Sequence, residues 1–410
     1  MAEFYPTTYD ANRSLAGGLK RGQITQDDAD LIRQFTNERV ARAGISAARA
    51  KKITSVLVSL RRYILVPYRD VKMSDIDAAL TTLKNTNHTV PNTVSKPKPY
   101  SQNTKSDVIT ILKSFLLWMI AKKLIKISID DVNEIRAPAV NTETTRPEDL
   151  LTRDEILALI EVAKQPRDKA LIGLLYESGC RIGELARLQW RDIAFEEEWV
   201  ELRVRDIKTH ENKEPKVRHA CLVMAKEYLA RWKDATTYKG PNDLVFVSLQ
   251  DGSALSYIAL RRIIDRLGKA AGINKRLNPH IFRKSRITHL VNENYQESIV
   301  KRSMWNNLNT RMFNTYVRLG KDDIDEEMLA KAGVKQKKVV TKNPLAPRPC
   351  GRCQKMNPPT ARFCNKCGYQ LTGEVIDSMD DARRRAEESP AFKAAYELLL
   401  QKTIEEQGKR

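Results

Sequence analysis

Four of the chain's six cysteines lie within 18 residues near the C-terminus, in the arrangement C-x2-C-x10-C-x2-C. Each Cys-x-x-Cys pair can present two thiolates from a tight turn, and two such turns complete a tetrahedron around Zn²⁺. The segment 350–372 holds few apolar residues, so metal binding would supply its folding energy, about 10–16 kcal/mol in comparable peptides. Four thiolates leave no position for water. We therefore predict a structural zinc ribbon with the ligands Cys350, Cys353, Cys364 and Cys367.

The other two cysteines, Cys180 and Cys221, lie far apart in apolar sequence and are expected in the core. This distribution favours a metal site in a reducing compartment over a disulfide framework. The N-terminus lacks the apolar centre of a signal peptide, and no apolar run is long enough to span a bilayer. We therefore expect a cytoplasmic protein with no membrane partner.

The charge of the chain indicates a polyanionic partner. Its 410 residues include 71 Lys and Arg against 51 Asp and Glu, a formal net charge of +20. Each phosphate that a basic residue neutralises releases a counterion and strengthens binding to nucleic acid. The basic residues are scattered along the whole chain, which favours a folded basic surface over a disordered basic arm.

Composition and periodicity divide the chain into two larger domains and several smaller segments. Thr25 is expected to cap the first long helix, and Thr152 and Glu155 form a capping-box pattern at the start of the second domain. In "WVELRVRDIKTHENKEPKVRHACLV" two alternating apolar runs flank a charged turn, which predicts a β-hairpin. The expected fold is mainly α with a small β-hairpin or sheet, so that the second domain is α+β. The predicted division is an N-terminal extension 1–24, a helical domain 25–136, a linker 137–149, the second domain 150–334, a linker 335–349, the zinc ribbon 350–372 and a helical tail 373–410.

Two arginines stand where a phosphate could be bound. Arg181, in "YESGCRIGELARL", lies where a helix restarts after a glycine turn, and a helix N-terminus favours an anion. His280 and Arg283, in "NPHIFRKSRITHL", share one face of a helix that Pro279 can begin. A guanidinium presents donors that match two phosphate oxygens.

The order Gly-x-Arg-x-x-Glu-Leu, basic hairpin, His-x-x-Arg and then a tyrosine in "FNTYVRL" resembles the catalytic domain of the tyrosine recombinases, the phage-type integrase family. The resemblance covers residues 150–334 closely. It extends more loosely over 25–136, which is similar to the family's helical core-binding domain. The zinc cluster behind the tyrosine is similar to that of archaeal integrase-like members.

The resemblance implies a role for each matching residue. Arg181 and Arg283 would hold the non-bridging oxygens of the scissile phosphate, and His280 would hydrogen-bond the phosphate and assist proton transfer. Tyr316 would be the nucleophile. Lys208 would protonate the departing 5′ oxygen. Lys213 and Lys216 are near enough in the sequence to be alternatives to Lys208.

The chain departs from the family near the nucleophile. Where most members carry Leu-Gly-His, this chain has "RSMWNNLNTRMFNTY", so Trp305 is the best candidate for the sixth catalytic position, with Asn306 or Asn307 as alternatives. The residue two after the tyrosine, often histidine in the family, is Arg318. Glu184, Asp192 and Thr288 are expected to be structural.

By resemblance, the chain would exchange DNA strands at specific sites through a 3′-phosphotyrosyl intermediate, without ATP or a catalytic metal. The partners would be double-stranded DNA carrying recombination sites and three further copies of the chain in a synaptic tetramer, with localisation at the nucleoid. The zinc module and long N-terminus favour an integrase of a virus, plasmid or other mobile element. The alternatives are a Xer-like chromosome dimer resolvase and a non-catalytic zinc-containing DNA-binding protein. The ribbon is expected to sit on a tether and assist DNA binding or synapsis, with a stabilising cap on the second domain as the alternative.

Overall fold

The computed structural model describes residues 11–85, 87–88, 98–142, 145–197, 199–204, 216–220, 223–334 and 343–371, together with 389–390, 392 and 396. The described residues form two compact units, a helical unit over residues 11–142 and a second unit that begins at Thr145. The boundary between them falls within the segment 137–149. No helix among the described residues has both the length and the apolar character needed to cross a bilayer.

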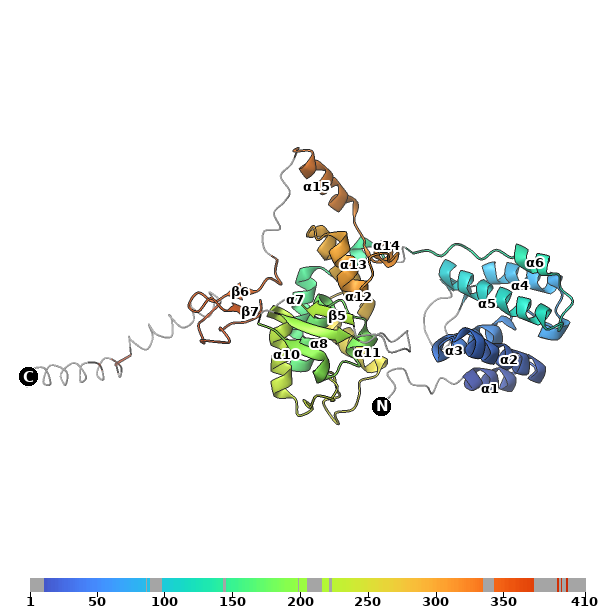
Figure 1. Cartoon of the computed structure of the whole chain (residues 1–410), viewed down its shortest axis with the longest axis horizontal. Coiled ribbons are helices and arrows are strands. Elements are labelled where there is room, and N and C mark those ends of the chain that lie inside the picture. Colours follow the sequence, from blue (N-terminus) through green and yellow to red (C-terminus); the bar gives the residue numbers. More distant parts are fainter. Residues whose placement is uncertain are drawn as a thin grey trace, which may run out of the picture. The chain divides into compact units, whose positions relative to one another are not determined.

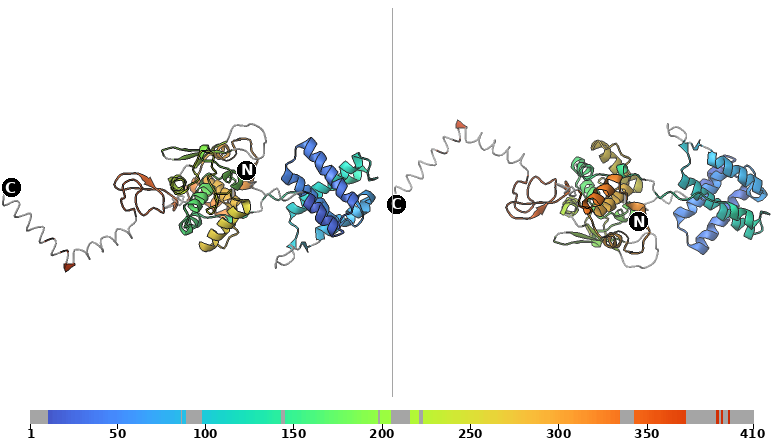
Figure 2. Two further views of the ribbon diagram at one scale, coloured as in Figure 1. Left: turned by 90° about the horizontal axis from the view of Figure 1, so that it is seen from below. Right: turned by 90° about the horizontal axis from the view of Figure 1, so that it is seen from above.

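The helical unit is a bundle of helices (Figure 2), and buried apolar residues of these helices form its core. At its centre the Phe115 ring lies 5.2 Å from Phe35 and 5.0 Å from Tyr68, between ring centroids. The predicted cap at Thr25 is confirmed, because its hydroxyl accepts from Asp28 N–H and the Asp28 carboxylate accepts from Thr25 N–H. The elements are α1 (Ala11–Lys20), α2 (Gln26–Ala43), α3 (Ala47–Leu60), a 3₁₀ turn at Tyr68–Asp70, α4 (Met73–Asn85), β1 (Asn87–His88) paired with β2 (Lys98–Pro99), α5 (Gln102–Ala121) and α6 (Ile129–Glu134).

Helix α1 belongs to this bundle, whereas the sequence analysis assigned residues 1–24 to an extension. Leu15 and Ile24 are buried in the core of the helical unit. Gly18 lies so close to α3 that a Cβ atom there would meet Val58 Cγ1 at 2.9 Å. The close approach of α1 and α3 therefore depends on glycine at this position.

The second unit is a group of packed helices with a small three-stranded antiparallel sheet on one side (Figure 1 and Figure 2). The capping box of Thr152 and Glu155 is confirmed at the start of α7. The predicted hairpin is confirmed as β4 paired with β5, and β3 adds a third strand that the sequence analysis did not foresee. The elements are α7 (Arg153–Val162), α8 (Pro166–Glu177), α9 (Ile182–Leu185), β3 (Ile193–Phe195), β4 (Val200–Val204), β5 (Lys216–Ala220), α10 (Val223–Ala235), α11 (Tyr257–Ala270), α12 (Pro279–Asn292), α13 (Glu297–Trp305), α14 (Met312–Tyr316), α15 (Lys321–Lys331), β6 (Arg348–Pro349) and β7 (Met356–Asn357), with 3₁₀ turns at Pro147–Asp149 and Trp190–Asp192.

Helix α8 is the centre of the second unit. Every residue from Ala170 to Glu177 is buried, including Tyr176 at 1% exposure. It packs against α7, α10 and α12 and ends immediately before the Gly-Cys-Arg step. The apolar run of α8 can therefore lead directly to Arg181, because this helix lies inside the unit and its C-terminal end packs near α12.

Candidate active site and metal centre

Arg283, on α12, lies at the centre of the candidate active site. As predicted, Pro279 is the first residue of α12, and the Asn278 carboxamide oxygen caps the helix by accepting from Ile281 N–H at 3.2 Å. Arg283 has 0% exposure. Its Nη1 donates to Gly179 O, and its Nη2 donates to Met304 O at 2.7 Å. One guanidinium thus joins the end of α8 to the end of α13.

Two aromatic rings cover this guanidinium. Arg283 Cζ lies 5.0 Å from the centroid of the Trp305 ring and 5.3 Å from that of Tyr316. The two rings are 5.5 Å apart in an edge-to-face arrangement, and both are buried, with exposures of 8% and 7%. The structure therefore brings together Arg283, Trp305 and Tyr316 from α12, α13 and α14, which lie side by side (Figure 1).

The end of α13 explains how Trp305 can approach a tyrosine eleven residues later. Asn306 follows in the left-handed conformation at φ 53°, which ends the helix and turns the chain. Asn306 and Asn307 are exposed, whereas Trp305 is buried. In the part of the chain that the structure describes, the buried Trp305 Nε1 has no hydrogen-bond partner. Of the three residues considered for the sixth position, Trp305 is the one that contacts Tyr316.

Gly179 allows α13 to come this close. It has φ +56°, which favours glycine, and a Cβ there would lie 2.8 Å from Met304 Sδ. Its carbonyl accepts from Arg283 while its chain continues, two residues later, to Arg181. The glycine of the Gly-x-Arg motif therefore positions both arginines.

Arg181 is held by its own helix. Glu184 accepts from Arg181 N–H at 2.7 Å and from Arg181 Nη1 at 2.8 Å. The anion at this helix N-terminus is thus a carboxylate of the chain, in the structural role expected for Glu184. The Arg181 side chain stays 33% exposed, so part of it faces solvent.

His280 reaches the surface beside the two arginines. Partial burial, followed by the charges of Arg181 and Arg283, lowers the pKa of His280. The imidazole is therefore neutral near pH 7, with one nitrogen able to donate and the other able to accept a hydrogen bond.

The candidate general acids fall mostly outside the described residues. Lys208 and Lys213 lie in the segment 205–215, which the structure does not describe. Lys216 is the first residue of β5, and its side chain also lies outside the description. The assignment of the general acid thus stays a prediction.

The remaining residues singled out by the sequence have structural partners. Asp192 accepts from Gln189 N–H at 3.1 Å and caps a 3₁₀ turn, and Thr288 Oγ1 accepts from Arg318 N–H at 3.1 Å. Cys180 has 0% exposure. Cys221 lies outside the described residues.

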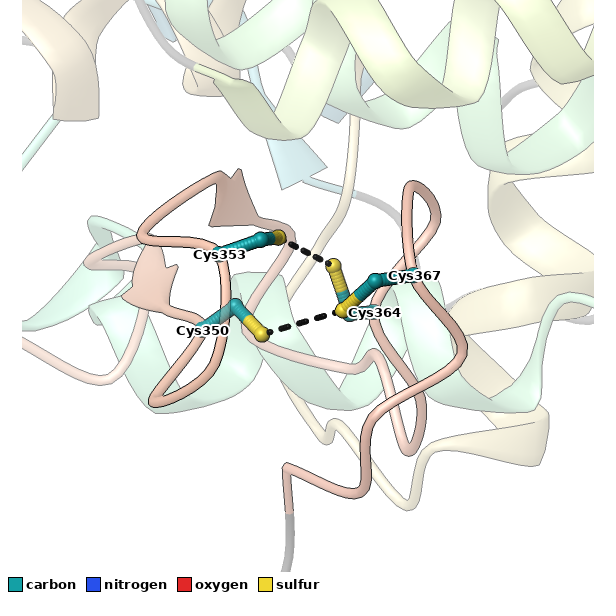
Figure 3. Close-up of side chains that lie close together, drawn as sticks. All are labelled: Cys350, Cys353, Cys364 and Cys367. Carbon is teal, nitrogen blue, oxygen red and sulfur yellow. Dashed lines mark hydrogen bonds between the residues drawn. The ribbon is translucent and has the colours of Figure 1, made fainter.

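The four clustered cysteines form a site that can hold a metal ion. Their Sγ atoms all lie within 4.8 Å of one another, with 3.5 Å between Cys350 and Cys367 and between Cys353 and Cys364 (Figure 3). A zinc ion with Zn–S bonds of 2.3 Å would place tetrahedral ligands about 3.8 Å apart. The thiols therefore have the chemistry and spacing that Zn²⁺ requires.

Backbone N–H groups also prepare this site for thiolates. Arg352 N–H and Lys366 N–H each lie 3.4 Å from a sulfur, those of Cys350 and Cys364 respectively. Burial would raise the pKa of Cys364, but backbone N–H groups and the neighbouring thiols lower it to about 6. The Cys364 thiolate is therefore accessible at neutral pH. The Tyr369 N–H lowers the pKa of Cys367, but burial and the neighbouring thiols raise it to about 12, so a bound metal would have to displace protons from the cluster.

The cysteine module contacts α10 of the second unit. Tyr228 Oη is hydrogen-bonded to Thr360 Oγ1, and Arg231 Nη2 donates to Asn365 Oδ1 at 2.6 Å. Asn365 Nδ2 in turn donates to Glu227 Oε2 at 2.6 Å. From the sequence we expected a ribbon on a tether, with a stabilising cap on the second domain as the alternative. The contacts with α10 favour the cap.

The anchors around the arginines and the tyrosine were not predicted from the sequence. Met304 and Gly179 act through backbone carbonyls, which leave no signal in residue type. Arg318 was noted only as a departure from the family, yet its Nε donates to Thr145 O at 3.0 Å. Its 7% exposure could not be read from a basic residue in a polar segment.

Comparisons with known proteins find similarity over the second unit. The model of the phage integrase family matches residues 149–322. Transposase A from transposon Tn554 of Staphylococcus aureus is 27% identical over 184 residues, which are 43% of this chain and 50% of that protein. Tyrosine recombinase XerA of Pyrococcus furiosus is 30% identical over 176 residues, 42% of this chain and 57% of the relative. The chain thus spans about half the length of the curated relatives it matches.

Solved structures share the fold. The integrase of transposon Tn1549, in complex with transposon right end DNA, superposes with a TM-score of 0.52 at 18% identity, over 74% of this chain and 99% of that one. A lambda integrase dimer bound to a COC′ core site gives a TM-score of 0.50 at 17% identity, over 70% and 94%. The predicted fold, mainly helical with a small antiparallel sheet, is confirmed.

Proposed function

Residues 149–322 of this chain match the phage integrase family, and we propose that the chain is a site-specific DNA recombinase. It would cut and rejoin DNA strands through a 3′-phosphotyrosyl intermediate. The observation that carries the proposal is the convergence of Arg283, Trp305 and Tyr316 beside His280 and Arg181. These are the residue types that phosphoryl transfer to a tyrosine needs: guanidinium groups for the phosphate charge, a neutral imidazole, an indole N–H and a phenol.

Each group would act on a different part of the scissile phosphate. Arg181 and His280, which reach solvent, would meet it first. Arg283 has no exposed surface, so its contact with a phosphate oxygen requires the Tyr316 ring to move off the guanidinium. The displaced phenol would then attack phosphorus and pass its proton to the neutral His280 imidazole, while the bond from phosphorus to the 5′ oxygen breaks. The buried Trp305 N–H would supply a further donor to the charge that develops.

The nucleophile needs cationic neighbours. A phenol has an ordinary pKa of about 10, so little phenolate exists at neutral pH without nearby positive charge. The arginines proposed to bind the scissile phosphate, Arg181 and Arg283, would place that charge beside the attacking oxygen. The proton for the departing 5′ oxygen would come from Lys208 or one of its alternatives, Lys213 and Lys216.

Zinc would have a structural role. The four thiols fit Zn²⁺ and leave no position for water or substrate, so the metal would close the fold of residues 350–372. The contacts with Tyr228, Arg231 and Glu227 support a ribbon that caps α10. We also propose that this ribbon corresponds to the zinc cluster of archaeal integrase-like proteins.

DNA is the proposed partner because of the net charge of +20 and the family of the domain. A synapse of four copies and localisation at the nucleoid are part of the proposal. The relatives include both a transposase and a Xer-type recombinase, so the function is proposed as strand exchange at specific sites, of a mobile element in the first instance.

A suicide substrate tests the proposal. In a duplex nicked next to the cleavage site, the short 5′-hydroxyl product diffuses away and the covalent intermediate accumulates. The wild type should give an adduct that survives denaturing electrophoresis, and Tyr316→Phe should bind the DNA within about threefold but give none. DNA binding without any adduct from the wild type would instead support a non-catalytic DNA-binding protein.

A further inference from the structure

We propose that Arg318 is a positioning residue for the nucleophile: it fixes the chain directly after Tyr316 to α12, to the end of α14 and to the entry of the second unit. The inference rests on the proposed function, since it concerns the tyrosine that the proposal makes the nucleophile. The position is one at which the chain departs from the family.

The guanidinium of Arg318 reaches two separate segments. Its Nε donates to Thr145 O at 3.0 Å, and its Nη1 donates to Asn314 O at 3.2 Å and to Val317 O at 2.6 Å. Asn314 is within α14, so these bonds satisfy carbonyls at the C-terminal end of the nucleophile's helix. Arg318 is 7% exposed, which is rare for an arginine that only faces solvent.

The backbone at Arg318 is fixed as well. Its N–H donates to the hydroxyl of Thr288, which is 3% exposed on α12. The same helix carries His280 and Arg283. Lys284, also on α12, contacts the Thr145 hydroxyl, so the entry segment is bound to α12 from a second side.

Helix α14 cannot hold itself in place. It has five residues, too few for a stable isolated helix, and it follows a loop of exposed residues. In the proposed function the Tyr316 ring leaves Arg283 when a phosphate binds. Anchors on the backbone after the tyrosine would let the ring move by side-chain rotation while its Cα stays fixed. A chain without them would lose the register between phenol and phosphate.

The expected effect of Arg318→Ala is therefore on Tyr316 and not on DNA binding. The rate of adduct formation at saturating suicide substrate should fall about 10- to 100-fold, as for a misplaced reacting group, with an unchanged half-saturating DNA concentration. Arg318→Lys keeps one donor group and should recover part of the rate. The matched control is Arg302→Ala, which removes the same charge from an exposed site on α13.

A second readout needs no activity. Nitration of Tyr316 by tetranitromethane in the free protein reports how far the buried ring opens, and it is read by mass spectrometry of the tryptic peptide that holds this tyrosine alone (312–318, or 312–321 in Arg318→Ala). The initial nitration rate should rise at least about threefold in Arg318→Ala and stay at the wild-type value in Arg302→Ala.

Wild-type nitration and a wild-type adduct rate in Arg318→Ala would overturn the proposal, as would a loss of rate explained wholly by weaker DNA binding. If Arg318→Ala does not fold, Thr288→Val decides, with Thr288→Ser as its control: raised nitration in the valine variant supports the anchor, and unchanged nitration refutes it. If even the wild type forms no adduct, the proposed function fails, while the nitration comparison still tests the anchor.

Discussion

Chelation of the metal proposed for the four-cysteine ribbon should destabilise the whole second unit. Without the ion, residues 350–372 lose the energy that closes two thiol turns, because so short a segment has little core of its own. Their contacts with α10 depend on that closed shape. Helix α10 packs on α8, the central helix of the unit, so the loss should reach beyond the ribbon itself.

The size of the effect follows from three hydrogen bonds. Tyr228 with Thr360, Arg231 with Asn365, and Asn365 with Glu227 join the ribbon to α10. At about 1 kcal/mol each they contribute about 3 kcal/mol. For a unit of this size, 1 kcal/mol corresponds to roughly 2–4 °C, so the melting temperature should fall by about 6–12 °C. Burial raises the pKa of Tyr228 to about 12, so its hydroxyl keeps its proton throughout the assay range.

The assay is thermal unfolding of the full chain by calorimetry, with and without a zinc chelator, after the metal content has been measured. Asn365→Ala is the internal control, since it removes two of the three bonds and leaves all four thiols in place. This variant should bind zinc at the wild-type stoichiometry. Its melting temperature should be lower than that of the wild type, and chelation should lower it by a smaller amount. An unchanged melting temperature of the second unit after chelation would refute the cap and return the ribbon to the role of a tethered accessory.

Four further outcomes test the site. Arg181→Ala should lower adduct formation by about 10²-fold or more with little change in melting temperature, because this side chain is 33% exposed. Arg283→Ala should lower both, because the buried guanidinium also joins two backbone carbonyls; equal melting temperatures would contradict this. Trp305→Phe, which keeps a ring over the arginine but lacks the N–H, should lower the rate about 10²-fold, whereas Asn306→Ala should not. Burial, followed by the charges of Arg153 and Arg286, lowers the pKa of His289 to about 3. The unfolded chain therefore binds a proton at His289 below pH about 6.5 that the folded chain does not bind, and stability should fall by about 1.4 kcal/mol per pH unit from there towards pH 3. His289→Gln should lose this component in urea titrations, and an identical pH slope in the variant would show that the imidazole is not held neutral.

The elements that sequence could predict are those whose signal is local. The caps at Thr25 and Thr152 and the helix start at Pro279 follow from residue type and position, and the hairpin follows from alternation. β3 escaped because three residues are too short for a periodic signal. The partnership of Arg283 with Trp305 and Tyr316 was expected only through the resemblance, since no spacing places a residue of α13 over one of α12.

The parts that sequence could not predict depend on backbone geometry. The residue types of Gly179 and Met304 do not indicate that their backbone carbonyls accept hydrogen bonds from Arg283. They also do not indicate that Gly179, in the left-handed conformation, lies close to the Met304 side chain. The bond from Arg318 to Thr145 joins residues that are 173 positions apart in the sequence. A linker such as "KQKKVVTKNPLAPRP" gives the length of a connection, but it does not indicate whether the module after it docks.

The central claim is that Tyr316 becomes covalently joined to a 3′ phosphate of DNA. The most direct measurement is mass spectrometry of the adduct trapped on a suicide substrate, after nuclease and trypsin digestion. Cleavage after Arg311 and Arg318 yields a peptide of residues 312–318 in which Tyr316 is the one tyrosine. We predict that this peptide carries the nucleotide remnant on Tyr316 and that Tyr316→Phe yields none. A remnant on any other residue, or an adduct that persists in Tyr316→Phe, would contradict the account.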